Sequence, residues 1–149
     1  MKKTIIVGLL ILMLAMMLTG YAEELPEEKT MMQIKINDTP VTVTWEENES
    51  VDALKELAQN GLTIRMSMYG GFEQVGPIGQ RLPRQDVQTS TSSGDIVLYS
   101  GNQLVVFYGS NSWAYTRLGH IDDKTPDEMR ELLGNGDVII TLEYDGGDD

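Results

Sequence analysis

The sequence predicts a mainly β protein, a closed antiparallel β-barrel with two short helices toward the barrel ends. Short runs in which every second residue is apolar recur along the chain, and this period of two is typical of half-buried strands. Only two segments show the period of a helix. They do not alternate with the strands as successive βαβ units would require, so we expect the strands to pair antiparallel.

The first two strands are expected to form a hairpin. Met32, Ile34 and Ile36 alternate with polar residues, which indicates a strand with one buried face. Residues 37–40 have the composition of a turn, and a second apolar run follows at residues 41–45. The short separation places the two strands side by side.

A helix is predicted after this hairpin, because the hydrophobic period changes at Ser50. Val51, Leu54 and Ala58 fall on one face of a helix, and Ser50 is the expected N-cap. Gly61 is placed where the chain must leave the helix. We expect this helix to cover one end of the barrel.

Strict alternation over residues 62–69 predicts the next strand. Its even-numbered residues are apolar and are expected to face the core, whereas the odd-numbered residues, Arg65 among them, are expected to face outward. Two glycines at positions 70 and 71 end this strand. Residues 72–84 are predicted to be a loop, since their two prolines limit regular pairing.

The middle of the chain predicts a Ser/Thr-rich connection followed by three strands. Residues 85–93 are polar and of low complexity, which favours a solvated connection. Apolar strands joined by a short turn are expected at residues 95–99 and 104–108. A loop that carries Trp113 then leads to a strand at residues 117–121.

The second helix has the stronger boundary signals. Thr125 is the expected N-cap, Pro126 the first helical residue and Glu128 the partner of a capping box, and Gly134 ends the helix. A last alternating strand is expected over residues 137–144.

We expect one folded domain behind a signal peptide. Residues 1–22 combine a basic start, a continuous apolar run and small residues near the expected cleavage point. Cleavage would release a secreted, periplasmic or cell-surface protein, whereas an uncleaved leader would keep the chain anchored in the membrane. The remaining segments are a flexible tether at residues 23–30, the domain at residues 31–145 and a disordered tail at residues 146–149.

The charge balance excludes several classes of partner. The chain has a formal net charge of −12, and loss of the two lysines in the leader would make it still more acidic. Such a charge repels nucleic acid and anionic lipid surfaces, so neither is an expected partner, and no membrane contact is expected beyond the leader. No cysteine and only one histidine, His120, are present, so no soft-metal site, no Cys-His or Ser-His pair and no cofactor is expected.

The segment from Gly94 to Ile121 resembles the second half of the cyclophilin-like superfamily, especially its small bacterial members. Gly94-Asp95 opens one strand, Phe107-Tyr108 closes the next, and Leu118-Gly119 follows. The resemblance extends over most of residues 31–144 and implies a cyclophilin-like β-barrel. This expectation agrees with the fold class that the hydrophobic pattern predicts.

The resemblance also implies where a site would lie. Cyclophilins direct an arginine at the prolyl amide beside an aromatic pocket, and Arg65, Phe72 and Gln74 are similar in order to that pattern. Tyr108 and Trp113 match the aromatic positions of the pocket, as Phe107 also does. Each has a simpler alternative: Arg65 as a solvated charge, and Phe107 and Tyr108 as core residues.

Two hypotheses of different class follow. The first is a noncatalytic exported domain that binds a peptide or small-molecule ligand in a groove between the segment Arg65 to Phe72 and the loop that bears Trp113. The second is a peptidyl-prolyl cis-trans isomerase that uses Arg65 as the catalytic residue, with Phe72, Gln74 and an aromatic pocket. The sequence leaves the natural ligand and the oligomeric state open.

Overall fold

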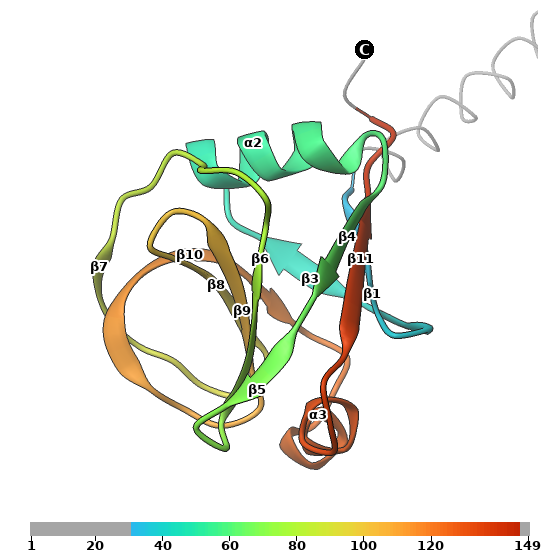
Figure 1. The fold of residues 1–149 in the computed structure, drawn as a ribbon, viewed down its shortest axis with the longest axis vertical. Helices are drawn as coiled ribbons and strands as arrows, with labels where there is room; N and C mark the ends of the chain where they lie inside the picture. The colour runs from blue at the N-terminus through green and yellow to red at the C-terminus, as the bar shows by residue number, and fades with distance from the viewer. Residues whose placement is uncertain (1–30, 147–149) are drawn as a thin grey trace, which may run out of the picture.

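A computed structural model describes residues 31–146 of the chain. The expected signal peptide, the tether and all but the first residue of the expected tail lie outside the described residues. Within residues 31–146 the protein is mainly β, with two α-helices and two antiparallel sheets (Figure 1). The prediction of a mainly antiparallel β protein with two helices is confirmed.

The smaller sheet joins the two ends of the described chain. Its strand order is β2-β1-β11-β4, and every pairing in it is antiparallel. Ile34 and Ile36 of the first strand lie opposite Leu142 and Ile140 of the last, so the predicted alternation is realised in register. The strands are β1 (Gln33–Ile36), β2 (Thr39–Val41), β4 (Leu62–Arg65) and β11 (Ile139–Glu143).

The larger sheet contains seven strands in the order β3-β10-β8-β9-β6-β5, with β7 paired to one half of β10. Its pairings are also antiparallel. The strands are β3 (Val43–Trp45), β5 (Ser67–Tyr69), β6 (Glu73–Pro77), β7 (Val87–Ser90), β8 (Asp95–Tyr99), β9 (Gln103–Phe107) and β10 (Ser112–Ile121).

The predicted closed barrel is wrong, because neither sheet of residues 31–146 closes on itself. The two expected strands at residues 41–45 and 62–69 are each interrupted at one residue, Thr42 and Met66. Met66 donates its backbone N–H to the carbonyl of Val138, which lies just before β11. Both segments therefore pass from the smaller sheet to the larger one. Their strand pairing is interrupted at Thr42 and Met66, where the chain changes sheet.

The two helices lie at opposite ends of the molecule, as Figure 1 shows. Helix α2 spans Glu49–Ala58 and α3 spans Pro126–Leu133. The capping box of Thr125 and Glu128 is present as predicted. The first helix differs in its cap: Asn48, not Ser50, accepts the N–H of Val51, at 2.8 Å, while the Ser50 hydroxyl donates to the carbonyl of Pro83.

The central strands β8 and β9 of the larger sheet are buried on both faces, and this explains their unbroken apolar runs. One face packs into the main core with residues such as Leu98 and Val106, which are fully buried. The other face carries a second cluster made of Val97, Val105, Phe107 and Tyr115. A strand that is covered on both sides loses its polar alternation.

Two segments predicted as connections are strands. Residues 72–84 contain β6, which pairs with β5 and β9, and residues 85–93 contain β7, which pairs with β10. Strand β10 is also longer than predicted, so Trp113 lies on a strand and not in a loop. Ser/Thr composition and proline suggest loops locally, but the pairing partners of these segments lie far away in the sequence.

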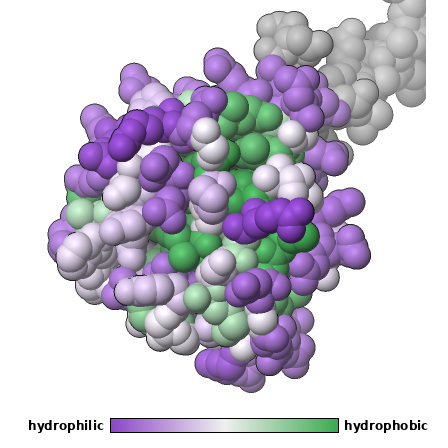
Figure 2. Space-filling view, viewed as in Figure 1, coloured by the Kyte–Doolittle hydropathy of each residue, from purple (hydrophilic) through white to green (hydrophobic). Residues whose placement is uncertain are grey.

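Figure 2 shows one face of the molecule, with hydrophilic residues around most of its outline and hydrophobic residues gathered between α2 and the strands beneath it. The main core lies under this region and draws on both sheets and both helices. Ile36 from β1, Leu54 from α2, Leu104 from β9 and Leu133 from α3 are all fully buried.

Candidate functional site

A cleft with aromatic walls lies on the outer face of the larger sheet. Its volume is about 540 Å³, within the range of pockets that hold small molecules. The lining residues come from β5, β6, β8, β9 and β10 and from the residues next to these strands. Nine residues line it: Tyr69, Phe72, Glu73, Val75, Tyr99, Gln103, Asn111, Trp113 and Tyr115.

The second apolar cluster supports this cleft from below. Phe107 is fully buried and packs edge to face on Tyr115, with 5.7 Å between ring centroids. Tyr115 in turn meets Tyr99 at 6.1 Å. Because these rings pack against each other and against the sheet, the floor of the cleft is preformed.

Two large aromatic side chains at the rim are exposed. Tyr69 is 63% exposed and Trp113 is 55% exposed. Tyr69 also meets Phe72 edge to face at 6.1 Å. Exposed aromatic side chains that border a hollow are a common feature of binding surfaces.

The turn between β5 and β6 fixes the position of Phe72. Gly70 has a φ of +66° and a side chain at this position would collide with the Phe72 ring. The Phe72 carbonyl accepts backbone N–H groups from Tyr108 and Gly109, at 3.0 and 2.9 Å. The glycine pair that the sequence marked as a strand end is therefore the turn that seats one wall of the cleft.

The Glu73 carboxyl group lines the cleft together with these aromatic side chains. Only 6% of the residue is exposed, and its side chain has no hydrogen bond or ion pair within residues 31–146. Burial raises its pKa from 4.5 to about 7, because the charged form loses hydration. A buried carboxyl without a partner is rare in proteins.

Tyr115 is the second titratable group of the cleft with a shifted pKa. Burial raises its pKa, and the nearby Glu73 raises it further, against the lowering effect of a hydrogen bond with Asn111. Asn111 Nδ2 donates this hydrogen bond to the Tyr115 hydroxyl at 2.9 Å. The phenol is therefore neutral over the physiological pH range.

The structure brings two of the residues singled out from the sequence together. Phe72 and Trp113 both line the cleft. Gln74 and Tyr108 lie elsewhere: Gln74 is fully buried and donates to the carbonyls of Leu133 and Gly136, at 2.8 and 2.7 Å. Tyr108 belongs to the main core and is 7% exposed.

Arg65 is separate from the cleft. It ends β4, lies opposite Ile139 in the smaller sheet and is exposed, as the alternation predicted. It is not one of the nine residues that line the cleft. None of those nine is basic, and Glu73 is the only acidic one.

Sequence reasoning missed most of the cleft. Glu73 and Val75 were assigned to a loop, and Tyr99 and Tyr115 were not singled out. One signal was available: Tyr69 and Phe72 flank a glycine pair and an acidic residue follows directly. The alternation of β6 was hidden, because this strand has a buried Gln on one face and a buried Glu on the other.

His120 has a structural partner. Its Nδ1 lies 2.8 Å from Asp95 Oδ1, while Arg117 Nη1 lies 3.3 Å from the other carboxylate oxygen. This arrangement links β8 to β10. In the part of the chain that the structure describes, no group of three or more His, Cys, Asp and Glu residues could hold a metal ion. No helix between residues 31 and 146 is long and apolar enough to cross a membrane.

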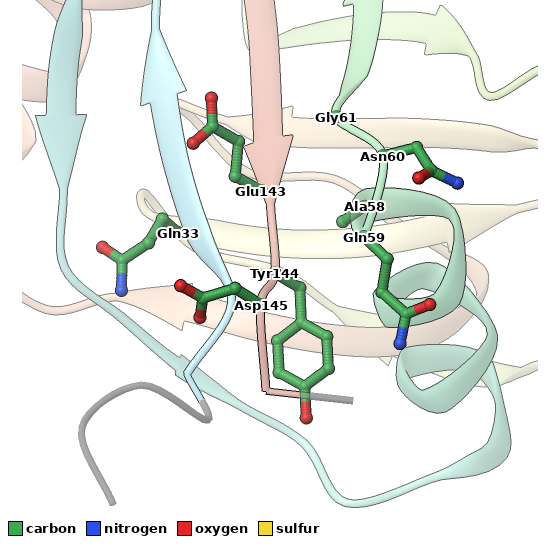
Figure 3. Close-up of a pocket in the computed structure, with 8 residues that line it drawn as sticks. All are labelled: Gln33, Ala58, Gln59, Asn60, Gly61, Glu143, Tyr144 and Asp145. Atoms are coloured by element: carbon green, nitrogen blue, oxygen red, sulfur yellow. The ribbon is translucent and has the colours of Figure 1, made fainter. Parts of the chain in front are cut away.

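A second hollow, of about 520 Å³, lies where β1, β11 and the end of α2 meet. Figure 3 shows that the Asn60 amide and the Glu143 carboxylate point away from the Tyr144 ring, so the side chains do not converge. Lys55 Nζ already lies 5.4 Å from the centre of that ring. We regard the aromatic cleft as the better candidate site.

Comparison with known proteins agrees with the fold. No curated protein and no solved structure matches the chain. A family model described as the Cyclophilin-like family matches residues 34–143, which include all of β4 to β10 and both helices. On this evidence the chain belongs to the cyclophilin-like family.

Proposed function

We propose that this protein is an exported, noncatalytic binding domain that takes a peptide or small-molecule ligand in the aromatic cleft. The observation that carries the proposal is the pair of exposed rings, Tyr69 and Trp113, at the rim of a hollow with a packed floor. Export rests on the leader-like pattern of residues 1–22.

The geometry favours binding over the isomerase alternative. Catalysis of prolyl rotation would need a cation beside the pocket that holds the proline, because the barrier of ~18–20 kcal/mol comes from amide resonance. Arg65 does not line the cleft, and the Gln74 amide is bound to two carbonyls in the interior. The three residues of the isomerase hypothesis are therefore not arranged around one pocket.

A fluorescence screen of peptides and small molecules tests the proposal. A ligand in the cleft should change the emission of Trp113, and Trp113→Phe should abolish the change. Trp45→Phe is the matched control, since the Trp45 indole N–H donates to the carbonyl of Met32 at 3.0 Å, away from the cleft. A change that survives Trp113→Phe and disappears in Trp45→Phe would contradict the proposed site.

A protease-coupled prolyl-peptide assay tests the alternative. We expect no acceleration over the uncatalysed isomerisation, which takes ~10–100 s at 25 °C. Acceleration that is lost in Arg65→Ala and kept in Arg130→Ala would replace the binding proposal with the isomerase. Arg130 is a suitable control, because it is exposed and its ion pair within residues 31–146 is with Asp127 on its own helix.

A further inference from the structure

The Glu73 carboxyl is the unusual feature of the cleft. It is nine-tenths buried, lines the hollow and has no partner among residues 31–146. Desolvation of a carboxyl without compensation is unfavourable, so most buried carboxyls are paired. Within residues 31–146 the fully buried side-chain polar atoms without a hydrogen bond are Gln74 Oε1 and Ser93 Oγ, so the Glu73 oxygens keep contact with the open side of the cleft, where a cation can reach them.

The walls around this carboxyl have the chemistry that a cation prefers. Four aromatic residues besides Phe72 line the same hollow, and they come from three different strands: Tyr69, Tyr99, Trp113 and Tyr115. The faces of such rings carry negative partial charge and attract ammonium groups, Trp most strongly. The formal charge of −12 on the whole chain adds a long-range attraction for cations.

We propose that the aromatic cleft recognises an alkylated ammonium group, held between the aromatic rings with Glu73 as its counter-ion. This inference rests on the proposed binding function and names the chemical class of the ligand. The ammonium group can belong to a free amine or to an alkylated lysine side chain.

An alkylated ammonium needs fewer hydrogen-bond acceptors in the cleft than a guanidinium does. A guanidinium brings five N–H donors that each need an acceptor. Besides the Glu73 carboxylate, the side-chain acceptors of the lining are the amide oxygens of Gln103 and Asn111 and the hydroxyls of the three tyrosines. A methylated ammonium has few or no N–H groups and is satisfied by ring faces and one carboxylate.

The ionisation of Glu73 sets the conditions for a test. Its pKa of about 7 leaves the carboxyl partly protonated at neutral pH, so binding should be measured at about pH 8.5. Tyr69, Tyr99 and Tyr115 also line the cleft, and burial raises the pKa of Tyr115, which keeps that phenol neutral at this pH. At this pH the ionised Glu73 carboxylate is the charged group in the cleft lining that would attract a cation.

The experiment compares choline with 3,3-dimethylbutan-1-ol, which has the same shape and carries carbon in place of the charged nitrogen. Binding to the full-length chain is followed by NMR chemical shifts. We expect choline to bind about tenfold more tightly than the neutral compound, with shifts centred on Tyr69, Glu73 and Trp113. A peptide with trimethyllysine is the third probe, and its affinity relative to choline distinguishes a side chain from a free amine.

Two variants complete the test. Glu73→Gln keeps the shape of the side chain and should weaken choline binding several-fold, while the neutral compound binds as before; the ring faces retain the rest of the preference for the charged ligand. Glu131→Gln removes one charge from the exposed face of α3 and should leave both affinities unchanged.

The outcomes separate this inference from the proposed function. Equal affinities for choline and the neutral compound would overturn the ammonium proposal and leave the cleft as a binding site. Failure of all three probes to shift the cleft residues would overturn the ammonium proposal too, and the fluorescence screen would then decide the proposed function independently.

Discussion

At the scale of single residues, Glu73 and Gln74 are neighbours with opposite roles. Successive side chains of a strand point to opposite faces, so Glu73 faces the cleft while Gln74 faces the core. Gln74 links β6 to the end of α3 through two backbone carbonyls. The residue that resembles a family site position is thus placed in the interior, and the neighbour that the sequence did not mark is placed in the cleft.

Glu73 makes the stability of the protein dependent on pH. Its pKa is raised from 4.5 to about 7 in the folded protein, so the folded state binds the proton more tightly than the unfolded state. The free energy of unfolding should therefore fall as the pH rises from 4.5 to about 7. By that linkage the ionised carboxyl costs up to about 3 kcal/mol above this range.

We expect Glu73→Gln to stabilise the protein at about pH 8 by 1 to 3 kcal/mol, because an amide carries no charge to desolvate. At about pH 4 the gain should vanish, since both side chains are then neutral. Urea unfolding at the two pH values measures the difference, with Glu131→Gln as the exposed control. An equal effect at both pH values would show that ionisation of Glu73 is not the cause.

The positions of Phe72, Trp113 and Tyr108 show how much of a site a residue pattern alone can predict. Both were assigned to a site from their order in the sequence, and both line the cleft. Tyr108 was assigned by the same resemblance and is instead a core residue, because it continues from β9 on the face opposite to Phe107. Which face a strand residue occupies depends on register, and register depends on distant partners.

At the scale of elements, the caps of α3 were predictable and those of α2 were less so. The α3 start combines Thr125, Pro126 and Glu128 at fixed spacings, and Thr125 and Glu128 form the reciprocal hydrogen bonds of a capping box. At α2 both Asn48 and Ser50 are suitable cap residues. The choice depends on tertiary contacts: the Asn48 Nδ2 donates to the Arg117 carbonyl at 2.9 Å, and Ser50 bonds to Pro83.

Thr125→Ala should destabilise the protein by about 1 kcal/mol, because the N–H of Glu128 loses its acceptor. The reciprocal bond from the Thr125 N–H to the Glu128 carboxylate, at 2.9 Å, is the main cause that lowers the pKa of Glu128. Chemical denaturation measures the change. Thr125→Ser is the matched control and should retain most of the stability; loss of equal size in both variants would contradict a role of the hydroxyl.

The strands missed by sequence reasoning share one physical cause. Thr89 and Thr91 around β7 are buried although they are polar, and each hydroxyl donates to a backbone carbonyl. Strand β6 contains Gly76 and ends at Pro77. Gly and Pro have low strand propensity, whereas Thr has a high one but is polar. In both strands pairing with distant partners, and not the local sequence, decides the structure.

At the scale of the whole molecule, Gly76 brings the two sheets together. A Cβ at this position would collide with the Arg65 carbonyl and would lie 2.7 Å from Met66 Sδ and 2.9 Å from Ile64 Cγ2. Strand β6 of the larger sheet therefore passes directly over the corner between β4 and β5. Only glycine allows this approach.

Gly76→Ala should destabilise the protein by about 2–3 kcal/mol, because the colliding atoms include backbone that cannot rotate away. Gly71→Ala is the comparison: its φ is +73° and nothing lies within 4 Å, so only backbone strain of about 1 kcal/mol is expected. Thermal unfolding of both variants ranks the two effects. A smaller loss for Gly76→Ala than for Gly71→Ala would argue against close contact of the sheets.

The sequence by itself determined the antiparallel β class, both helices and the outward position of Arg65. These features depend on local periodicity, on caps and on short motifs, which act over a few residues. The tertiary structure decided the division into two sheets, the strands β6 and β7, and the meeting of Glu73 with aromatic rings from three other strands. Strand pairing and burial on both faces join residues far apart in the chain, and no local pattern specifies those partners.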